Sequence, residues 1–206
     1  MKRRGQQAWF VFNTRLSQTE VYYYPPNGSE INLFVPENDK ILKVREYVSL
    51  NCREYNVNVV TLKDLKKIAD EIRKMDSGIA VVFDTGLYEL PNDSKWLIKM
   101  AGAAGTDNTA FVSTQVWKGR FIKSCGYSYR DGKYCANDNG RLRPAPMRYL
   151  NFNTQLTGEG VFAVKPALLK EIAPDKKDIR DISLKAYKRG LFNVILCVKV
   201  MQKNAA

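Results

Sequence analysis

Histidine is absent from the chain, and this absence narrows the chemistry open to it. A histidine-based catalytic triad is excluded, and so is a zinc cluster, because the cysteines form no CxxC pair either. We expect the cysteines to be free thiols, since apolar neighbours such as those of Cys197 favour burial. The alternative is a disulfide between Cys125 and Cys135. The four cysteines are Cys52, Cys125, Cys135 and Cys197.

Long apolar runs are also missing. The longest ones, AWFVF, GIAVVF and NVILCV, fall far short of the roughly 20 residues that a membrane-spanning helix needs. The basic start MKRRGQQ leads into only five apolar residues, which do not make a signal peptide. We therefore expect a soluble, cytoplasmic protein. With 206 residues, of which 45% are hydrophobic, the chain can bury a full core as one domain.

Acidic residues are scarce in the second part of the chain. Residues 118–206 hold 18 Lys and Arg against 7 Asp and Glu, whereas residues 1–117 hold 15 against 14. Nearly all of the net charge of +12 therefore belongs to the last 89 residues. A basic half indicates an anionic partner, which could be nucleic acid, a phospholipid surface or a diphosphate ligand. The alternative is a solvated basic surface that binds nothing in particular.

Hydrophobic periodicity predicts alternating strands and helices in the first hundred residues. Short β-branched and aromatic runs predict strands at 8–14, 20–25, 31–36, 57–62 and 79–84. Apolar residues at helical spacing predict helices within 40–55 and 62–75. Such βαβ units predict an α/β fold, with a mixed, mainly parallel sheet flanked by helices.

The second half is less regular. A Gly-, Tyr- and Arg-rich stretch at 118–149 predicts loops and short hairpins. Around it we predict a helix at 94–105 capped by Asp93 or Ser94, strands at 110–117, 160–164 and 193–200, a helix at 166–172, and a helix at 181–189 ending at Gly190.

Three segments of the chain carry motifs in a fixed order. AVVFDTGLYELPNDSKWLIKM at 80–100 has a hydrophobic strand, a DXD-like element, a proline and a "W-L" helix. LTGEGVFAVKPALLKEI at 156–172 resembles the pattern TGxxxxVRRxALxxxG, and DIRDISLKAYKRGLFNVILCVKV at 178–200 resembles EDxDLSLRxxxxGyxixyvp. The spacing of nine positions from Asp181 to Gly190 is kept. Together the segments resemble the inverting glycosyltransferase family two, whose members have the GT-A fold.

The resemblance implies an enzyme that moves a sugar from a nucleotide-sugar donor, with a UDP-sugar as first choice, to an acceptor hydroxyl. It implies one GT-A-like (Rossmann-like) domain over 1–206, with a nucleotide-binding half at 1–100 and a basic acceptor half at 101–206. Because the basic surplus lies in the acceptor half, we rank modified DNA above lipid-linked phosphates and neutral glycans as acceptors. A chain this short for the fold would suit a phage or mobile-element enzyme.

On the donor side the resemblance assigns Pro36 and Asp39, with Glu37 as the alternative to Asp39, to the base and ribose. Asp64 is the second acidic position, and Asp84 is the first residue of the DXD element. That element has Gly86 in place of its second carboxylate. Mg²⁺ or Mn²⁺ held by Asp84 alone would therefore be bound weakly.

The missing metal ligands lead to a hypothesis about the leaving group. Gln202 or Lys203 stands near the position of the family's metal-binding histidine. Lysine and arginine side chains are natural partners of a diphosphate. We therefore hypothesise that basic residues meet the leaving-group charge, namely Lys199, Lys203, Arg141 and Arg143.

On the acceptor side the family's catalytic "ED" pair has changed to Asp178-Ile179. Asp178 and Asp181 are the candidates for the catalytic base, although Asp181 also fits a helix N-cap. The resemblance and the composition of the loops together give six acceptor-binding candidates. These are Gly158, Glu159, Tyr127, Tyr129, Arg141 and Arg143.

A different class of function stays open. Residues 118–149 combine eight Lys and Arg with five aromatic residues, including Tyr134. This mixture suits a surface for single-stranded or flipped nucleic acid, and it equally suits an acceptor loop that closes over a sugar nucleotide. The alternative to an enzyme is therefore a non-catalytic α/β module that binds nucleic acid. A structural protein with a basic face is the third interpretation.

Overall fold

The computed structural model describes residues 24–137, 139–140, 152–157, 160–172, 174–176 and 178–203. The strand predicted at 8–14 and most of the one predicted at 20–25 lie outside these residues, and Tyr24 and Pro25 are not part of a strand. None of the described helices is long and apolar enough to cross a membrane.

The first half consists of two βαβ units, as predicted. The first is β1 (Glu30–Pro36), α1 (Ile41–Asn51) and β2 (Asn56–Leu62), and the second adds η1 (Leu65–Lys67), α2 (Ile68–Lys74) and β3 (Ile79–Phe83). Both β2 and β3 pair with β1 in parallel, so that Leu33 lies between Val59 and Val81. All five residues of β3 are buried, which explains their unbroken apolar run.

The second half contains more strands than its sequence pattern predicts. Its elements are α3 (Trp96–Gly105), β4 (Thr109–Lys118), β5 (Phe121–Ser124), β6 (Tyr127–Arg130), β7 (Lys133–Ala136), β8 (Phe152–Thr154), β9 (Val161–Val164), α4 (Pro166–Ile172), α5 (Ile179–Lys188) and β10 (Phe192–Met201). The hairpins predicted within 118–149 include β6 and β7, which form a separate two-stranded sheet.

One mixed sheet unites the two halves. Its strands follow the order β2-β1-β3-β9-β4-β10-β8, and β5 pairs with β4 beside this path. Strand β9 is antiparallel to both β3 and β4, while β4 and β10 are parallel to each other. Phe162 of β9 therefore lies between Val82 and Ser113. The prediction of a mixed sheet flanked by helices is confirmed, but the prediction that it is mainly parallel is wrong, because β8, β9 and β5 all pair antiparallel with their neighbours.

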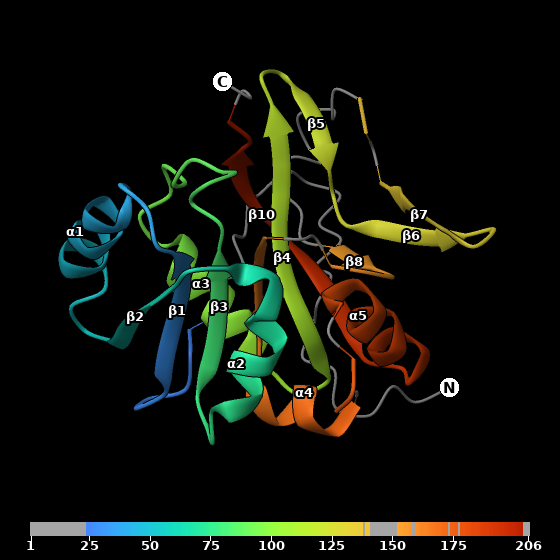
Figure 1. Ribbon diagram of the computed structural model, residues 1–206, viewed down its shortest axis with the longest axis horizontal. Helices are drawn as coiled ribbons and strands as arrows, with labels where there is room; N and C mark the ends of the chain where they lie inside the picture. Colours follow the sequence, from blue (N-terminus) through green and yellow to red (C-terminus); the bar gives the residue numbers. More distant parts are fainter. Residues whose placement is uncertain are drawn as a thin grey trace, which may run out of the picture.

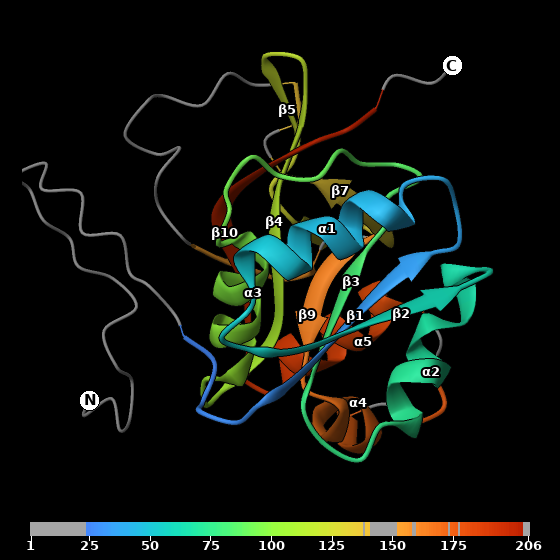
Figure 2. The same cartoon turned by 90° about the vertical axis from the view of Figure 1, so that its left-hand side faces the viewer.

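Helices cover both faces of this sheet (Figures 1 and 2). On one face α1 and α3 bury Val44, Trp96 and Leu97 against β1, β3 and β10. On the other face α2, α4 and α5 bury Ile72 and Leu169 together with the remaining side chains of the strands. Burying apolar surface on both faces is the main stabilising contribution in such a layered protein.

Three helix starts differ from the sequence prediction. The helix predicted at 62–75 begins only at Leu65, because β2 continues to Leu62 and the Asp64 side chain caps the first turn by accepting a hydrogen bond from Lys66 N–H. Helix α3 begins at Trp96, and Asp93 accepts from Lys95 N–H without being the N-cap. Helix α5 begins at Ile179, two residues early, because Asp178 caps it.

The cysteines are free, as predicted. Cys52 and Cys125 are buried, Cys197 is half-buried and Cys135 is exposed on β7. The alternative of a Cys125–Cys135 disulfide is therefore wrong.

Candidate functional site

The carboxyl ends of β1, β2 and β3 meet at one edge of the sheet, where α/β proteins bind ligands. Pro36 pairs with Leu62 at the ends of β1 and β2, and Phe83 ends β3. Because β9 is antiparallel, its beginning reaches the same edge, and Asp84 N–H donates to the Gly160 carbonyl at 2.7 Å. The fold thus places the DXD-like turn against the start of β9.

Asp84 has its carboxylate fixed by the turn that it begins. Oδ1 accepts hydrogen bonds from Gly86 N–H at 2.9 Å and from Leu87 N–H at 3.3 Å, while the Asp84 carbonyl accepts from Tyr88 N–H. None of the described residues donates to Oδ2. One carboxylate oxygen therefore shapes the turn, and the other is available to a ligand.

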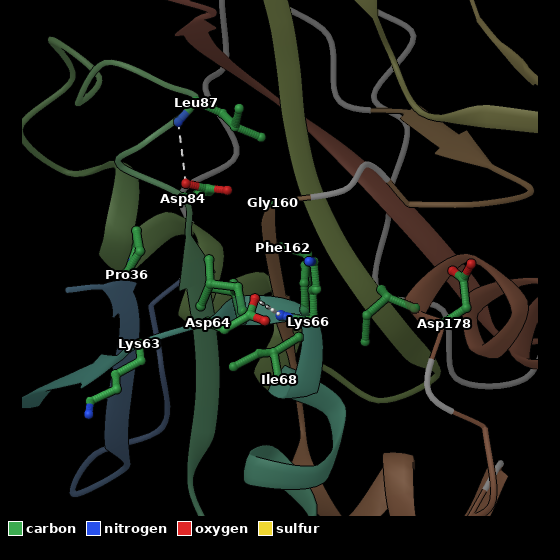
Figure 3. A pocket seen from close by; sticks show the side chains of 13 residues that line it. Pro36, Lys63, Asp64, Lys66, Ile68, Asp84, Leu87, Gly160, Phe162 and Asp178 are labelled. Carbon is green, nitrogen blue, oxygen red and sulfur yellow. Dashed lines mark hydrogen bonds between the residues drawn. The ribbon is translucent and has the colours of Figure 1, made fainter. Parts of the chain in front are cut away.

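A cleft with a volume of about 630 Å³ opens at this edge, within the size range of ligand sites. Asp84 lines it on one side and Asp178 on the other, with Asp64 and Lys66 between them (Figure 3). Its floor is apolar and comes from Val82, Phe162 and other side chains. The lining residues are Pro36, Lys63, Asp64, Leu65, Lys66, Ile68, Val82, Asp84, Leu87, Gly160, Phe162, Asp178 and Ile179.

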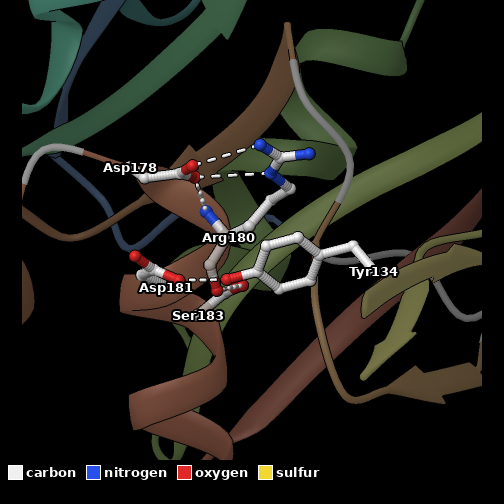
Figure 4. A network of polar contacts seen from close by, with 5 residues as sticks. All are labelled: Tyr134, Asp178, Arg180, Asp181 and Ser183. Carbon is white, nitrogen blue, oxygen red and sulfur yellow. Dashed lines mark hydrogen bonds and ion pairs between the residues drawn. The ribbon is translucent and has the colours of Figure 1, made fainter. Parts of the chain in front are cut away.

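Asp178 holds the start of α5 and pairs with Arg180. Its Oδ1 accepts from Arg180 N–H at 2.8 Å, and its Oδ2 lies 3.1 Å from Arg180 Nη2 (Figure 4). Partial burial works to raise the pKa of Asp178, but the hydrogen bonds and charge of Arg180 outweigh it and leave the pKa below its ordinary value. Asp178 is therefore ionised at neutral pH, with 40% of its side chain exposed.

Asp181 faces a different partner. Its Oδ1 accepts a hydrogen bond from the Tyr134 hydroxyl of β7, and the Arg180 guanidinium lies 4.7 Å from the centre of the Tyr134 ring (Figure 4). This hydrogen bond, together with burial and the carboxylate charges, raises the pKa of Tyr134 to about 12. Asp181 is not among the lining residues of the cleft. The predicted capping role belongs to Asp178 and not to Asp181.

The hairpin of β6 and β7 also contacts the segment that follows β8. Tyr129 N–H donates to Gln155 Oε1 at 2.8 Å, and Tyr127 bridges to Leu156. The Tyr129 and Tyr134 rings are 5.2 Å apart. Two of the predicted acceptor residues, Tyr127 and Tyr129, lie on this hairpin, whose Tyr134 is hydrogen-bonded to Asp181 of α5. Gly158, Glu159, Arg141 and Arg143 lie outside the described residues.

The remaining donor candidates are divided between separate places. Pro36 and Asp64 line the cleft. Asp39 is exposed and pairs with Lys40 at 2.9 Å, and this hydrogen bond lowers the pKa of Asp39. Lys199 lies over the Trp117 ring at 4.8 Å and lines another hollow, and Lys203 donates to the Thr85 carbonyl behind the Asp84 turn. The structure brings none of these three into the cleft.

The described donor set does not fit a resident Mg²⁺ or Mn²⁺. The position of the second DXD carboxylate is Gly86, and Asp84 Oδ1 already accepts two hydrogen bonds. Within the described ranges, no group of three Asp, Glu or Cys side chains is arranged to hold a metal ion. The positive charge that this part of the chain offers in the cleft comes from Lys63 and Lys66.

No family model and no curated protein gives a significant match to this chain. Its function must therefore be argued from the cleft itself.

Sequence reasoning missed several residues of the site. Lys63 and Lys66 line the cleft because the chain turns into η1 directly after β2, and this short 3-10 turn has no sequence signature of its own. The contact of Arg180 with the site could not be predicted, because its ion pair with Asp178 depends on the exact start of α5. A signal for Gly160 was present, since the TGEG turn precedes an apolar strand.

Proposed function

We propose that this protein is a glycosyltransferase that binds a nucleoside-diphosphate sugar in the cleft and transfers the sugar to an acceptor hydroxyl. The observation that carries the proposal is the cleft of about 630 Å³ lined by Asp84 on one side and Asp178 on the other. A mixed α/β sheet with its cleft at the carboxyl ends of the strands supports it, and so does the order of the motifs at 80–100, 156–172 and 178–200.

The donor occupies the part of the cleft between β1, β2 and β3. The base and ribose lie near Pro36 and Asp64, whose carboxylate is exposed beside Lys66. The diphosphate lies against Lys63 and Lys66, and the sugar lies toward Asp84, whose Oδ2 can accept a hydrogen bond from a sugar hydroxyl. Lys66 supplies the positive charge for the departing diphosphate, because lysine ammonium groups act as point charges toward phosphate oxygens.

Asp178 is the general base in this proposal. The acceptor oxygen attacks the anomeric carbon as the bond from that carbon to the diphosphate oxygen breaks, and the hydroxyl proton passes to Asp178. The leaving diphosphate carries away the electron pair of the broken bond. Displacement of this kind inverts the anomeric centre. Asp178 is ionised at neutral pH and can accept the proton, and its lowered pKa makes it a weaker base than an ordinary aspartate.

Binding of UDP, measured by titration calorimetry, tests the donor site. Asp84→Asn keeps an oxygen that can accept from Gly86 and Leu87, so it removes the charge while the turn remains. Lys66→Gln should weaken UDP binding about tenfold or more, and Asp76→Asn, an exposed aspartate outside the cleft, should leave it unchanged. Equal affinity in wild type and Lys66→Gln would reject the donor site.

Turnover of a panel of nucleotide sugars, followed by release of the nucleoside diphosphate, tests the chemistry. Asp84→Asn and Asp178→Asn should each lower kcat/KM at least a hundredfold. Activity should persist in EDTA, because the charge in the cleft comes from lysine. Complete loss in EDTA with recovery in Mn²⁺ would overturn the role of Lys66.

A second candidate is a non-catalytic module that binds nucleic acid. The observation in its favour is the hairpin of β6 and β7, where Arg130 and Lys133 are exposed beside the paired rings of Tyr129 and Tyr134. Salt-sensitive binding of single-stranded DNA that is lost in Tyr129→Ala, together with no binding of any nucleotide, would favour this module over the transferase.

A further inference from the structure

A second hollow lies on the other side of the turn that begins at Asp84. Its volume is about 410 Å³, and its lining includes Lys40, Lys43 and Lys203 together with Thr85 and Tyr88. We call it the lysine pocket. Thr85 lines the lysine pocket, whereas its neighbour Asp84 lines the cleft, and the two hollows share no lining residue. The turn therefore forms a wall between two separate sites.

Two distant parts of the chain supply the lysines. Lys40 is the N-cap of α1, Lys43 lies in its first turn, and Lys203 follows the end of β10. The Lys203 ammonium donates to the Thr85 carbonyl, and its backbone N–H donates to the Leu87 carbonyl at 2.9 Å. This convergence depends on the tertiary fold, because more than 150 positions of sequence separate Lys43 from Lys203.

Hydrogen bonds connect these parts into one frame. Asn38 Nδ2 donates to Thr85 Oγ1 at 2.9 Å, which joins the start of α1 to the Asp84 turn. Glu89 N–H donates to the Met201 carbonyl at 2.9 Å, which joins the loop after that turn to the end of β10. The lysines are thus presented from a preformed surface, so that little ordering is needed when a ligand binds.

The charge in the pocket is only partly compensated. Lys40 pairs with Asp39, but no ion pair joins Lys43 to another described residue. The first turn of α1 has no acidic residue, and Glu89 is the one acid among the described lining residues. Lys203 also acts on the Asp39 carboxylate, so the three ammonium groups face two carboxylates and leave one net positive charge, whose field the low-dielectric walls of the concave surface focus.

We propose that the lysine pocket is an anion site for the phosphate group of a small phosphomonoester, separate from the cleft. A phosphate carries charge and acceptor oxygens enough for several ammonium groups at once. Tyr88 and Leu90 add an apolar side to the pocket, which suits the organic part of such an ester and not a bare ion. The site does not depend on the function proposed for the cleft.

The shared wall predicts a coupling between the two sites. Thr85, whose carbonyl accepts from Lys203, directly follows the carboxylate that faces the cleft. If the cleft binds UDP, as proposed above, each ligand should change the affinity for the other by the same factor.

Titration calorimetry of the full chain with phenyl phosphate, and separately with inorganic phosphate, tests the site. Lys43→Gln should raise the dissociation constant for phenyl phosphate at least fivefold, and the pair Lys40→Gln, Lys43→Gln at least twentyfold. The control Lys188→Gln removes one positive charge at the exposed end of α5 and should change it less than twofold. Circular dichroism confirms that each variant is folded.

The outcomes separate this site from the cleft. Unchanged affinity for phenyl phosphate in the double variant would overturn the proposal. A loss of phenyl phosphate binding in Lys66→Gln would also overturn it, because it would show that the anion binds in the cleft. Equal affinity for inorganic phosphate and phenyl phosphate would overturn the assignment to an ester. Phenyl phosphate binding that survives while UDP fails to bind would reject the donor site and leave the lysine pocket standing.

Discussion

At the scale of single residues, Asp178 and Asp181 have different tasks that their sequence context does not distinguish. Both precede or begin the same apolar helix, and each suits an N-cap. The structure gives the cap and a place in the cleft to Asp178, and it gives the bond with Tyr134 to Asp181. The difference arises from where α5 starts, and helix boundaries are poorly determined by local pattern.

Arg180→Gln should raise the pKa of Asp178, because it removes the side-chain hydrogen bonds and the charge that oppose the effect of burial, while the bond from the backbone N–H of residue 180 stays. The lowered pKa of Asp178 stabilises the fold above the unfolded-state value of about 3.9, and this contribution is lost as the pH falls through the folded-state pKa. Carbon-13 NMR titration of the Asp178 carboxylate should show a higher midpoint in the variant. An unchanged midpoint would mean that Arg180 does not control this carboxylate.

At the scale of elements, the apolar runs predicted most strands and helices, but they could not predict their directions. VFAV of β9 has no feature that distinguishes a parallel from an antiparallel strand, since side chains alternate in the same way in both. Strand β8 has three residues, which is too short for a periodic pattern. The lysine pocket forms only where the start of α1, the loop after β3 and the end of β10 meet, so no local sequence motif predicts it.

Gly160 at the start of β9 is required for two separate reasons. Its φ is +73°, and an added Cβ would lie 2.9 Å from Tyr88 Cε2 and 3.3 Å from Asp84 Cβ. Gly132 has φ +75° with open space around it, which makes it a matched control. Both Gly→Ala variants should lose about 1–2 kcal/mol of unfolding free energy from the positive φ.

The free energy of unfolding should fall by roughly 1–3 kcal/mol more in Gly160→Ala than in Gly132→Ala, because the new methyl group is crowded at position 160 and has open space at position 132. Gly160→Ala should also weaken UDP binding, since the contact moves the Asp84 turn. Urea unfolding and calorimetry of both variants measure the two effects. Equal losses in the two variants would show that crowding beside Asp84 is relieved without cost.

The hairpin of β6 and β7 depends on Tyr134 for its contact with α5. Tyr134→Phe removes the hydroxyl that donates to Asp181 and should lower the unfolding free energy by about 1 kcal/mol. Trypsin should then cleave after Arg130 or Lys133 faster than in wild type. Tyr187→Phe, which changes an exposed tyrosine on α5 itself, is the control. Equal cleavage rates in wild type and Tyr134→Phe would show that other contacts hold the hairpin.

The pKa of Tyr134 provides an independent measure of the same contact. With a pKa of about 12, the phenol stabilises the fold fully below the unfolded value of about 10, and this contribution is lost as the pH rises through 12. Asp181→Asn removes the charge that the hydroxyl faces and should return the pKa toward 10. Absorbance near 295 nm, taken as the difference from Tyr134→Phe, follows the titration. A midpoint that stays near 12 in Asp181→Asn would assign the shift to burial instead.

At the scale of the whole molecule, the two halves of the sequence share one sheet. Strand β9, from the second half, lies next to β3 from the first, and α3 packs against strands of both. The net charge lies almost entirely in the second half of the sequence, whereas the hydrophobic core is built from side chains of both halves. We expect calorimetric unfolding in a single transition whose calorimetric and van't Hoff enthalpies agree. Two resolved transitions would show that residues 1–100 and 101–206 unfold separately.

The pairing of Gln202 and Lys203 with the loop after Asp84 also bears on how the protein is handled. Tyr88 bridges to Gln202, and Lys203 is bonded to Thr85 and Leu87. An affinity tag or a fused fluorescent protein that closely follows Lys203 would be tethered beside the lysine pocket. A polyhistidine tag at that position would bring titrating charge and chelated nickel to a surface whose anion binding is to be measured, so a removable tag is the better choice for such work.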